Sequence, residues 1–214
     1  MKTAKLQLSL TAAAFALCCV VVVLGAYVRL SAAGLGCPDW PGCYGHLTPS
    51  GAMENADQVA SRFGSEPIAV GKAWKEMTHR YAAATLGLII VVIAALAIQR
   101  RRTSPVGVPY AVGLLVLVIV QGILGMLTVT WQLKPLIVTA HLLLGLTTLA
   151  MLFWLLLTLI RRGSRAWTQH AAFVGQPLHR ARNLAVLGLA LLTLQLALGG
   201  WTSSNYAATA CPDF

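Results

Sequence analysis

Five long apolar runs divide this chain and limit what it can fold into. Each run has about 18–25 residues, and only the first two turns of the run at 74–98 carry charged side chains. Roughly 20 apolar residues suffice for a helix to span a bilayer. Backbone polar groups in lipid must be bonded within their own segment, so such runs predict transmembrane helices. The chain is 57% hydrophobic and 10% charged, whereas a soluble domain carries about 25% charged residues. We therefore expect an all-α integral membrane protein with helices at about residues 8–28, 74–98, 107–129, 136–160 and 184–201.

The charged residues are divided between the two ends of these runs. All six acidic residues fall on one predicted side of the membrane, and the arginines of 100–102 and 161–165 fall on the other. Basic loops are retained in the cytoplasm. This division therefore predicts a multi-pass protein of the bacterial plasma (inner) membrane with a cytoplasmic amino terminus. The orientation explains the net charge of +10, so we expect membrane lipid and no nucleic acid as a partner.

One internal repeat aligns residues 24–40 with residues 198–214 at a constant offset and without a gap. Each copy contains a helix exit followed by Cys-Pro-Asp and an aromatic residue. The last apolar run therefore resembles the first helix of a second, truncated repeat that follows a four-helix transmembrane bundle. We expect an amino-terminal half at 1–162 with an outer loop at 30–73, a cytoplasmic linker at 163–182, and an incomplete carboxyl-terminal half at 183–214.

Two histidines lie at matching depths in two of the runs. His79 precedes Gln99 by the same interval as His141 precedes Arg161, and Gln99 and Arg161 are the polar residues that mark the ends of those runs. At about 1.5 Å per residue, this interval places both imidazoles ~30 Å from the same membrane face. A lone histidine at a helix end is more often interfacial than a ligand. A matched pair favours axial ligation of a haem iron, since zinc needs further ligands and only Glu76 is near.

Three charged residues near this pair each have two interpretations. Glu76 is one turn from His79, where its carboxylate could place a negative charge or a proton acceptor beside the ring. Alternatively, Glu76 caps its helix or pairs with Lys72 or Arg80. Arg29 and Arg80 would bind either the two haem propionates or the phosphates of lipid headgroups.

The sequence Cys-Pro-Asp-Trp-Pro-Gly-Cys contains Cys37 and Cys43 on the acidic side of the membrane. In an oxidising compartment this spacing allows a disulfide, and a redox-active thiol pair or a purely structural role are the alternatives. A metal site is less favoured, because zinc pairs usually have two to four intervening residues and a second pair. Gln121 and Gln195 lie inside apolar runs, each four residues before a glycine, and we interpret both as helix-packing residues.

Four motifs together resemble the haem A synthase family, and the resemblance covers nearly the whole chain. They are Tyr-Val-Arg-Leu-Ser at 27–31, the segment from Gly34 to Cys43, Glu-Met-Thr-His-Arg at 76–80, and Gly-Gly-Trp-Thr at 199–202. The resemblance implies an eight-helix protein made of two four-helix halves. It also implies a membrane oxidoreductase that converts a methyl group of haem O to the formyl group of haem A for cytochrome oxidase.

The resemblance also implies roles for matching residues. His79 and His141 correspond to the pair that holds haem O as substrate and haem A as product, and Glu76 corresponds to a glutamate that assists the oxidation. Cys37 and Cys43 correspond to a periplasmic cysteine pair that is similar to a disulfide and takes part in haem transfer. A second histidine pair that binds haem b is implied for the other half, beyond this chain.

Haem O, haem O synthase and cytochrome oxidase assembly factors are the partners that the resemblance implies, and a homo-oligomer could replace the other half. Two alternatives to the enzyme stay open. One is a membrane b-type cytochrome that carries electrons or transfers haem, for which a carboxylate at Glu76 has no use. The other is an oxidase assembly protein without catalysis, which would tolerate the loss of both histidines.

Overall fold

The computed structural model describes residues 2–163 and 179–207, which contain seven α-helices and no strand. Five of these helices are long and apolar enough to cross a membrane, which confirms the all-α membrane class and the five expected spans. The Cys-Pro-Asp-Phe motif at 211–214 and most of the expected linker at 163–182 lie outside the described residues. The five spans are α1 (Lys2–Leu30), α4 (Val70–Gln99), α5 (Val108–Thr130), α6 (Pro135–Gly163) and α8 (His179–Ser204).

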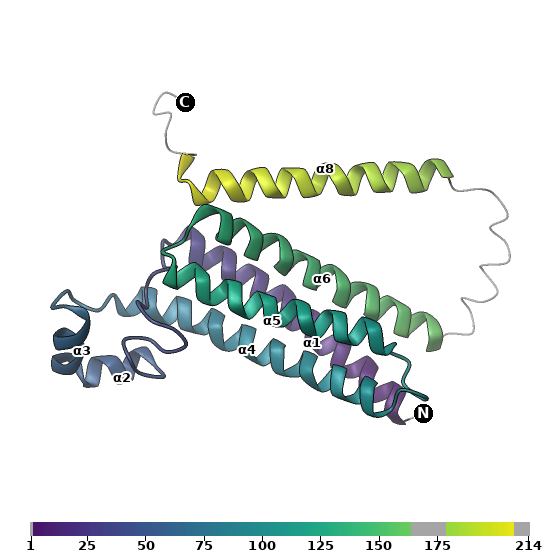
Figure 1. Ribbon diagram of the computed structural model, residues 1–214, viewed down its shortest axis with the longest axis horizontal. Coiled ribbons are helices and arrows are strands. Elements are labelled where there is room, and N and C mark those ends of the chain that lie inside the picture. The colour runs from purple at the N-terminus through teal and green to yellow at the C-terminus, as the bar shows by residue number, and fades with distance from the viewer. Residues whose placement is uncertain (1, 164–178, 208–214) are drawn as a thin grey trace.

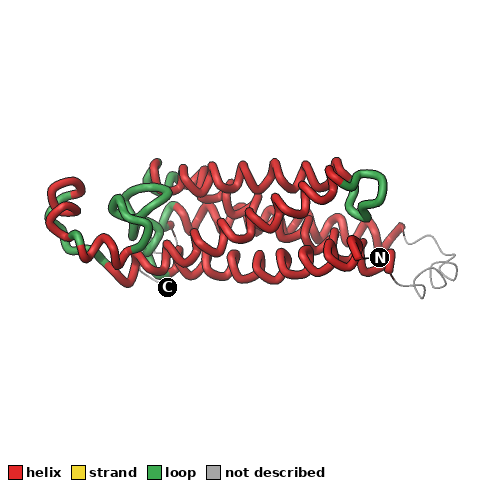
Figure 2. Tube along the Cα trace, turned by 90° about the horizontal axis from the view of Figure 1, so that it is seen from below, coloured by secondary structure: helices red, strands yellow, loops and turns green. Residues whose placement is uncertain are grey.

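Four of the helices form a closed bundle (Figure 1). α1 packs against α4 and α6, and α5 packs against the same two helices. Within the described residues α4 and α6 do not pack directly on each other, nor do α1 and α5, so each pair occupies one diagonal of the bundle. The tube view shows the long helices of the bundle lying side by side, with loops at both ends (Figure 2). We name the two ends the disulfide end, where α1 ends and α4 begins, and the arginine end, where α4 and α6 end.

The half of the bundle nearer the arginine end, here the arginine half, contains two buried hydrophobic clusters. Apolar side chains on all four helices interdigitate there, as the dense packing of protein interiors requires. The first cluster consists of Ala14, Cys18, Leu86, Ile90, Ile93, Leu114 and Leu152. The second consists of Ala94, Ala97, Val106, Ala111, Leu155 and Leu159.

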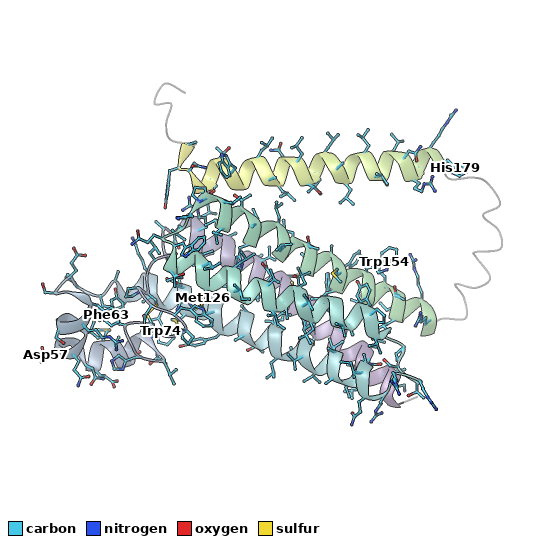
Figure 3. All side chains as sticks on the ribbon, in the orientation of Figure 1. Asp57, Phe63, Trp74, Met126, Trp154 and His179 are labelled. Carbon is cyan, nitrogen blue, oxygen red and sulfur yellow. A yellow bond between two sulfur atoms is a disulfide. The ribbon has the colours of Figure 1, made fainter. Side chains whose placement is uncertain are left out.

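Among the described helices α8 packs along α6, and Arg29 of α1 also reaches the end of α8. The contact is close at Gly200, where an added β-carbon would be 3.0 Å from Leu142 and 3.5 Å from Thr139. Toward its other end α8 carries exposed apolar side chains, including Leu184 and Leu189 (Figure 3). Such a surface is compatible with lipid, which is as apolar as leucine.

The outer segment between α1 and α4 contains two short helices, α2 (Pro49–Glu54) and α3 (Ala56–Phe63). Thr48 caps α2, since its side chain accepts a hydrogen bond from the Gly51 N–H at 3.2 Å. The Tyr44 ring meets the Phe63 ring edge-on at 5.6 Å, which ties α3 to the loop before α2.

Candidate functional site

The two histidines expected to bind a haem iron lie on one diagonal of the bundle. His79 is on α4 and His141 is on α6, the two helices that are separated by the bundle interior. Both residues lie near the start of their helices, which is the disulfide end of the bundle. The fold therefore places both histidines in the half of the bundle nearer the disulfide end, and their matched depth stays a prediction.

Each imidazole lies against a glycine on the other diagonal. A β-carbon added to Gly25 of α1 would be 3.1 Å from Cε1 of His79. One added to Gly125 of α5 would be 3.5 Å from Cε1 of His141. The first contact is tighter than ordinary van der Waals distance, so a side chain at Gly25 would displace the ring. Glycine at both positions leaves room for the two imidazoles.

The Nδ1 atoms of His79 and His141 are buried and have no hydrogen-bond partner in the described part of the chain. Buried polar atoms in folded proteins are normally paired, so two unpaired nitrogens need an explanation. Each residue as a whole remains partly accessible.

The surroundings of the pair extend along several turns of the four helices, a region we call the histidine layer. None of its residues is fully buried, in contrast to the clusters of the arginine half. A bundle interior packed at normal density would bury the inward side chains at this level. The histidine layer consists of residues 19–27 of α1, 78–85 of α4, 115–128 of α5 and 140–147 of α6.

The donor set suits a haem better than a bare metal ion. In the described ranges no group of three or more His, Cys, Asp or Glu side chains could hold a metal ion. Two histidines facing each other supply axial ligands to a metal whose other positions are filled by its own macrocycle. The residues present thus fit a haem held between His79 and His141.

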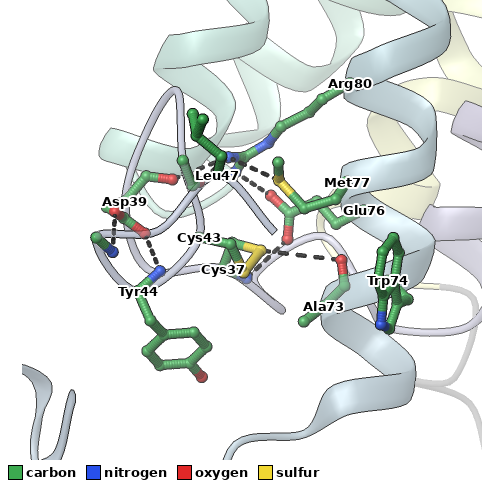
Figure 4. Close-up of a disulfide and its surroundings, with 12 residues drawn as sticks. Cys37, Asp39, Cys43, Tyr44, Leu47, Ala73, Trp74, Glu76, Met77 and Arg80 are labelled. Carbon is green, nitrogen blue, oxygen red and sulfur yellow. Dashed lines mark hydrogen bonds and ion pairs between the residues drawn. A yellow bond between two sulfur atoms is a disulfide. The ribbon is translucent and has the colours of Figure 1, made fainter. Parts of the chain in front are cut away.

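A disulfide-closed loop packs on α4 near the disulfide end (Figure 4). Cys37 and Cys43 are buried and bonded to each other, with their Cα atoms 4.7 Å apart. The pair packs against Ala73 and Met77 of α4. The backbone N–H of Cys37 donates to Oε2 of Glu76 at 3.0 Å. The sequence left several interpretations open for Cys37 and Cys43, and in the structure the two residues form a disulfide.

Arg80 connects Glu76 to the same loop (Figure 4). Its Nη2 forms a buried ion pair with Oε1 of Glu76, the pairing that one interpretation of the glutamate predicted. Its Nη1 donates to the carbonyl oxygens of Asp39 at 3.0 Å and Gly42 at 2.6 Å. The carboxylate of Glu76 is therefore fixed by two donors. Binding of a propionate by Arg80 stays a prediction.

Arg29 lies at the end of α1 and contacts the end of α8. Its Nη1 donates to the Tyr206 hydroxyl at 2.9 Å, and its guanidinium lies 4.3 Å from the centre of the Tyr206 ring. Its Nη2 donates to the carbonyl of Ser203. The internal repeat aligns Arg29 with Ser203, so this contact joins equivalent positions of the two copies. The predicted binding of a propionate by Arg29 stays a prediction.

Gln121 contacts His141, and the sequence alone did not identify it as a neighbour of the histidine pair. Gln121 of α5 donates from Nε2 to the main-chain carbonyl of His141 at 3.1 Å. Interpreting this residue as a helix-packing glutamine was incomplete, because its other polar atom, Oε1, is buried without a partner among the described residues. A polar side chain within an apolar span is itself a signal of function, since it is costly in lipid.

Fold and site together define a multi-pass helical membrane protein with a histidine pair inside a four-helix bundle. A family model described as cytochrome oxidase assembly protein (COX15-CtaA) matches residues 9–214. This match includes nearly the whole chain, so the chain belongs to that family.

Two curated relatives are similar along most of the chain. A heme A synthase from Shewanella oneidensis is 43% identical over 192 residues, which cover 90% of this chain and 55% of the relative. A heme A synthase from Novosphingobium aromaticivorans is 29% identical over 213 residues, which cover 88% of this chain and 57% of the relative. These findings confirm the resemblance drawn from the motifs. The chain spans about half the length of the curated relatives it matches. No solved structure matches it.

Proposed function

We propose that this chain binds haem O between His79 and His141 and acts in the oxidation of a haem O methyl group to the formyl group of haem A. The observation that carries the proposal is the pair of histidines on diagonally opposite helices, each with a buried Nδ1 that has no partner among the described residues. The family and the printed names of its relatives support haem A as the product. The glycines that adjoin the two rings leave room for the imidazoles inside the bundle, as ligation by this pair requires.

Glu76 is the carboxylate that we propose to assist the oxidation. It lies one turn from His79 toward the disulfide end, and it is held by the Cys37 N–H and by Arg80. A fixed negative charge near the reacting methyl carbon would stabilise positive charge that develops there. A haem b held by a second histidine pair, which the family resemblance implies for the other half, would supply electron transfer.

We also propose that the disulfide end faces the periplasm and the arginine end faces the cytoplasm. The described acidic residues lie toward the disulfide end or in the segment outside it, whereas Arg100–Arg102 and Arg161–Arg162 lie at the other end. A disulfide between Cys37 and Cys43 fits an oxidising compartment. Haem O synthase and cytochrome oxidase assembly factors are the proposed partners, and a homo-oligomer is a further proposal.

The test is the haem content of the chain purified from cells that also make haem O. Wild-type chain should retain haem O or haem A after acid extraction and chromatography, and H79A and H141A should lose it. His179 begins α8 and is exposed, so H179A is the matched control and should retain haem. Haem b alone in the wild-type chain would favour an electron carrier. Full retention of haem in both H79A and H141A would contradict the proposal.

A further inference from the structure

Gln121 is held in one orientation beside the histidine layer. The main-chain carbonyl of His141 can only accept a hydrogen bond, so the Gln121 nitrogen and not its oxygen must face it. Gly145 allows this approach, because a β-carbon there would lie 2.9 Å from the same nitrogen. The carboxamide is therefore fixed between α5 and α6, with Oε1 directed away from the His141 carbonyl.

Within the described residues, the oxygen of this carboxamide accepts no hydrogen bond. Gln121 Oε1 is one of five buried polar side-chain atoms without a hydrogen bond in the described residues. Three of the other unpaired atoms belong to His79, Thr139 and His141. These residues lie on α4 and α6, outside the arginine half. An unpaired acceptor is costly inside a membrane, where no bulk water can compensate it. A hydrogen-bond donor on a bound group would remove that cost.

The depth of Gln121 indicates which part of a haem would supply the donor. Its carboxamide lies near Gly145, four residues beyond His141 toward the arginine end, a displacement of about 6 Å along the helix. A haem with its propionates toward the disulfide end presents its opposite edge at this level. On that edge haem O has a hydroxyl-bearing isoprenoid tail where haem b has a vinyl group.

We propose that Gln121 accepts a hydrogen bond from the hydroxyl group of haem O and thereby makes this site prefer haem O over haem b. The proposal rests on the proposed function, because it takes His79 and His141 as the ligands of the iron. It assigns Gln121 two roles: Nε2 positions the His141 main chain, and Oε1 selects the substrate.

The test is a spectroscopic titration of the purified, haem-free chain with haem O and, separately, with haem b. Q121L keeps the side-chain volume and removes the acceptor, so it should lower the preference for haem O about fivefold, the effect of one buried hydrogen bond. Q121L also removes the Nε2 donor, so binding of haem b should weaken only through the lost contact with the His141 main chain. The haem b that still binds shows that the variant is folded. G145A provides a second test, because its methyl group would move the carboxamide without removing it. Gln195 is exposed on α8, so Q195L is the matched control and should leave the preference unchanged.

The other outcomes separate this proposal from the function on which it rests. An equal loss of affinity for both haems in Q121L would leave only the positioning role and overturn the selection of haem O. An unchanged preference in both Q121L and G145A would overturn the inference alone. A wild-type chain that binds neither haem would overturn the proposed function and this inference with it.

Discussion

The arginine half of the bundle and the histidine layer are formed by the same four helices, but they are packed differently. In the arginine half, Ile90 and Leu152 are completely inaccessible and belong to one continuous cluster. In the histidine layer no residue is fully buried, and polar atoms of His79, Gln121 and His141 lack partners among the described residues. The difference indicates that one region maintains the fold while the other leaves room for a ligand.

The contact of Arg80 with Glu76 and the disulfide-closed loop, which lies beside the histidine layer, gives the largest expected effect on stability. R80A would leave the buried carboxylate of Glu76 without its cation and the carbonyls of Asp39 and Gly42 without their donor. Breaking a buried ion pair costs about 3–5 kcal/mol. We therefore expect a loss of that size in the free energy of unfolding and faster reduction of the disulfide by an added thiol. Arg62 lies over the Phe63 ring at the surface, so R62A is the control and should change neither quantity appreciably.

The second prediction compares the two regions directly. I90A would open a cavity in the arginine half and lower the free energy of unfolding by about 2–5 kcal/mol. Leu144 is partly accessible in the histidine layer, so L144A should cost clearly less. Unfolding in mixed micelles with increasing denaturant would measure both. Equal costs would contradict the difference in packing on which the site assignment depends.

The third prediction concerns the glycine beside His79. In G25A the new methyl group would crowd the ring, and overpacking of this kind costs about 1–3 kcal/mol. Haem affinity should fall roughly tenfold, which corresponds to about 1.4 kcal/mol. G125A should have a smaller effect, since its contact with His141 is at ordinary van der Waals distance. Nothing lies within 4 Å of a β-carbon on Gly188, so G188A is the control, and an equal loss there would contradict the assignment.

Much of the fold could be predicted because hydropathy and length are properties of the sequence itself. All five spans were expected, although α1 and α4 extend beyond the apolar runs into polar residues such as Lys5 and Lys72. Helical hydrogen bonding continues past the hydrophobic boundary, whereas a hydropathy pattern ends there. A depth for each histidine could be predicted for a related reason. The rise per residue along a helix is constant, so a count of residues gives a distance.

The surroundings of the site could not be predicted in the same way. The contacts of Arg80 with Asp39 and Gly42 depend on how the loop folds back over α4, which lies far from it in the sequence. The spacing of Gln121 and Gly125 indicated helix packing, but only the structure shows which carbonyl the glutamine reaches. Long-range contacts of this kind arise from tertiary structure, and no local pattern encodes them.

The central claim is that His79 and His141 bind one iron from opposite sides. Electron paramagnetic resonance of the ferric haem-bound chain tests it most directly. The account predicts a low-spin signal typical of two imidazole ligands, and loss of that signal in H79A and in H141A together with the bound haem. A low-spin signal that is unchanged in both variants would show that other groups hold the iron, and it would contradict the account.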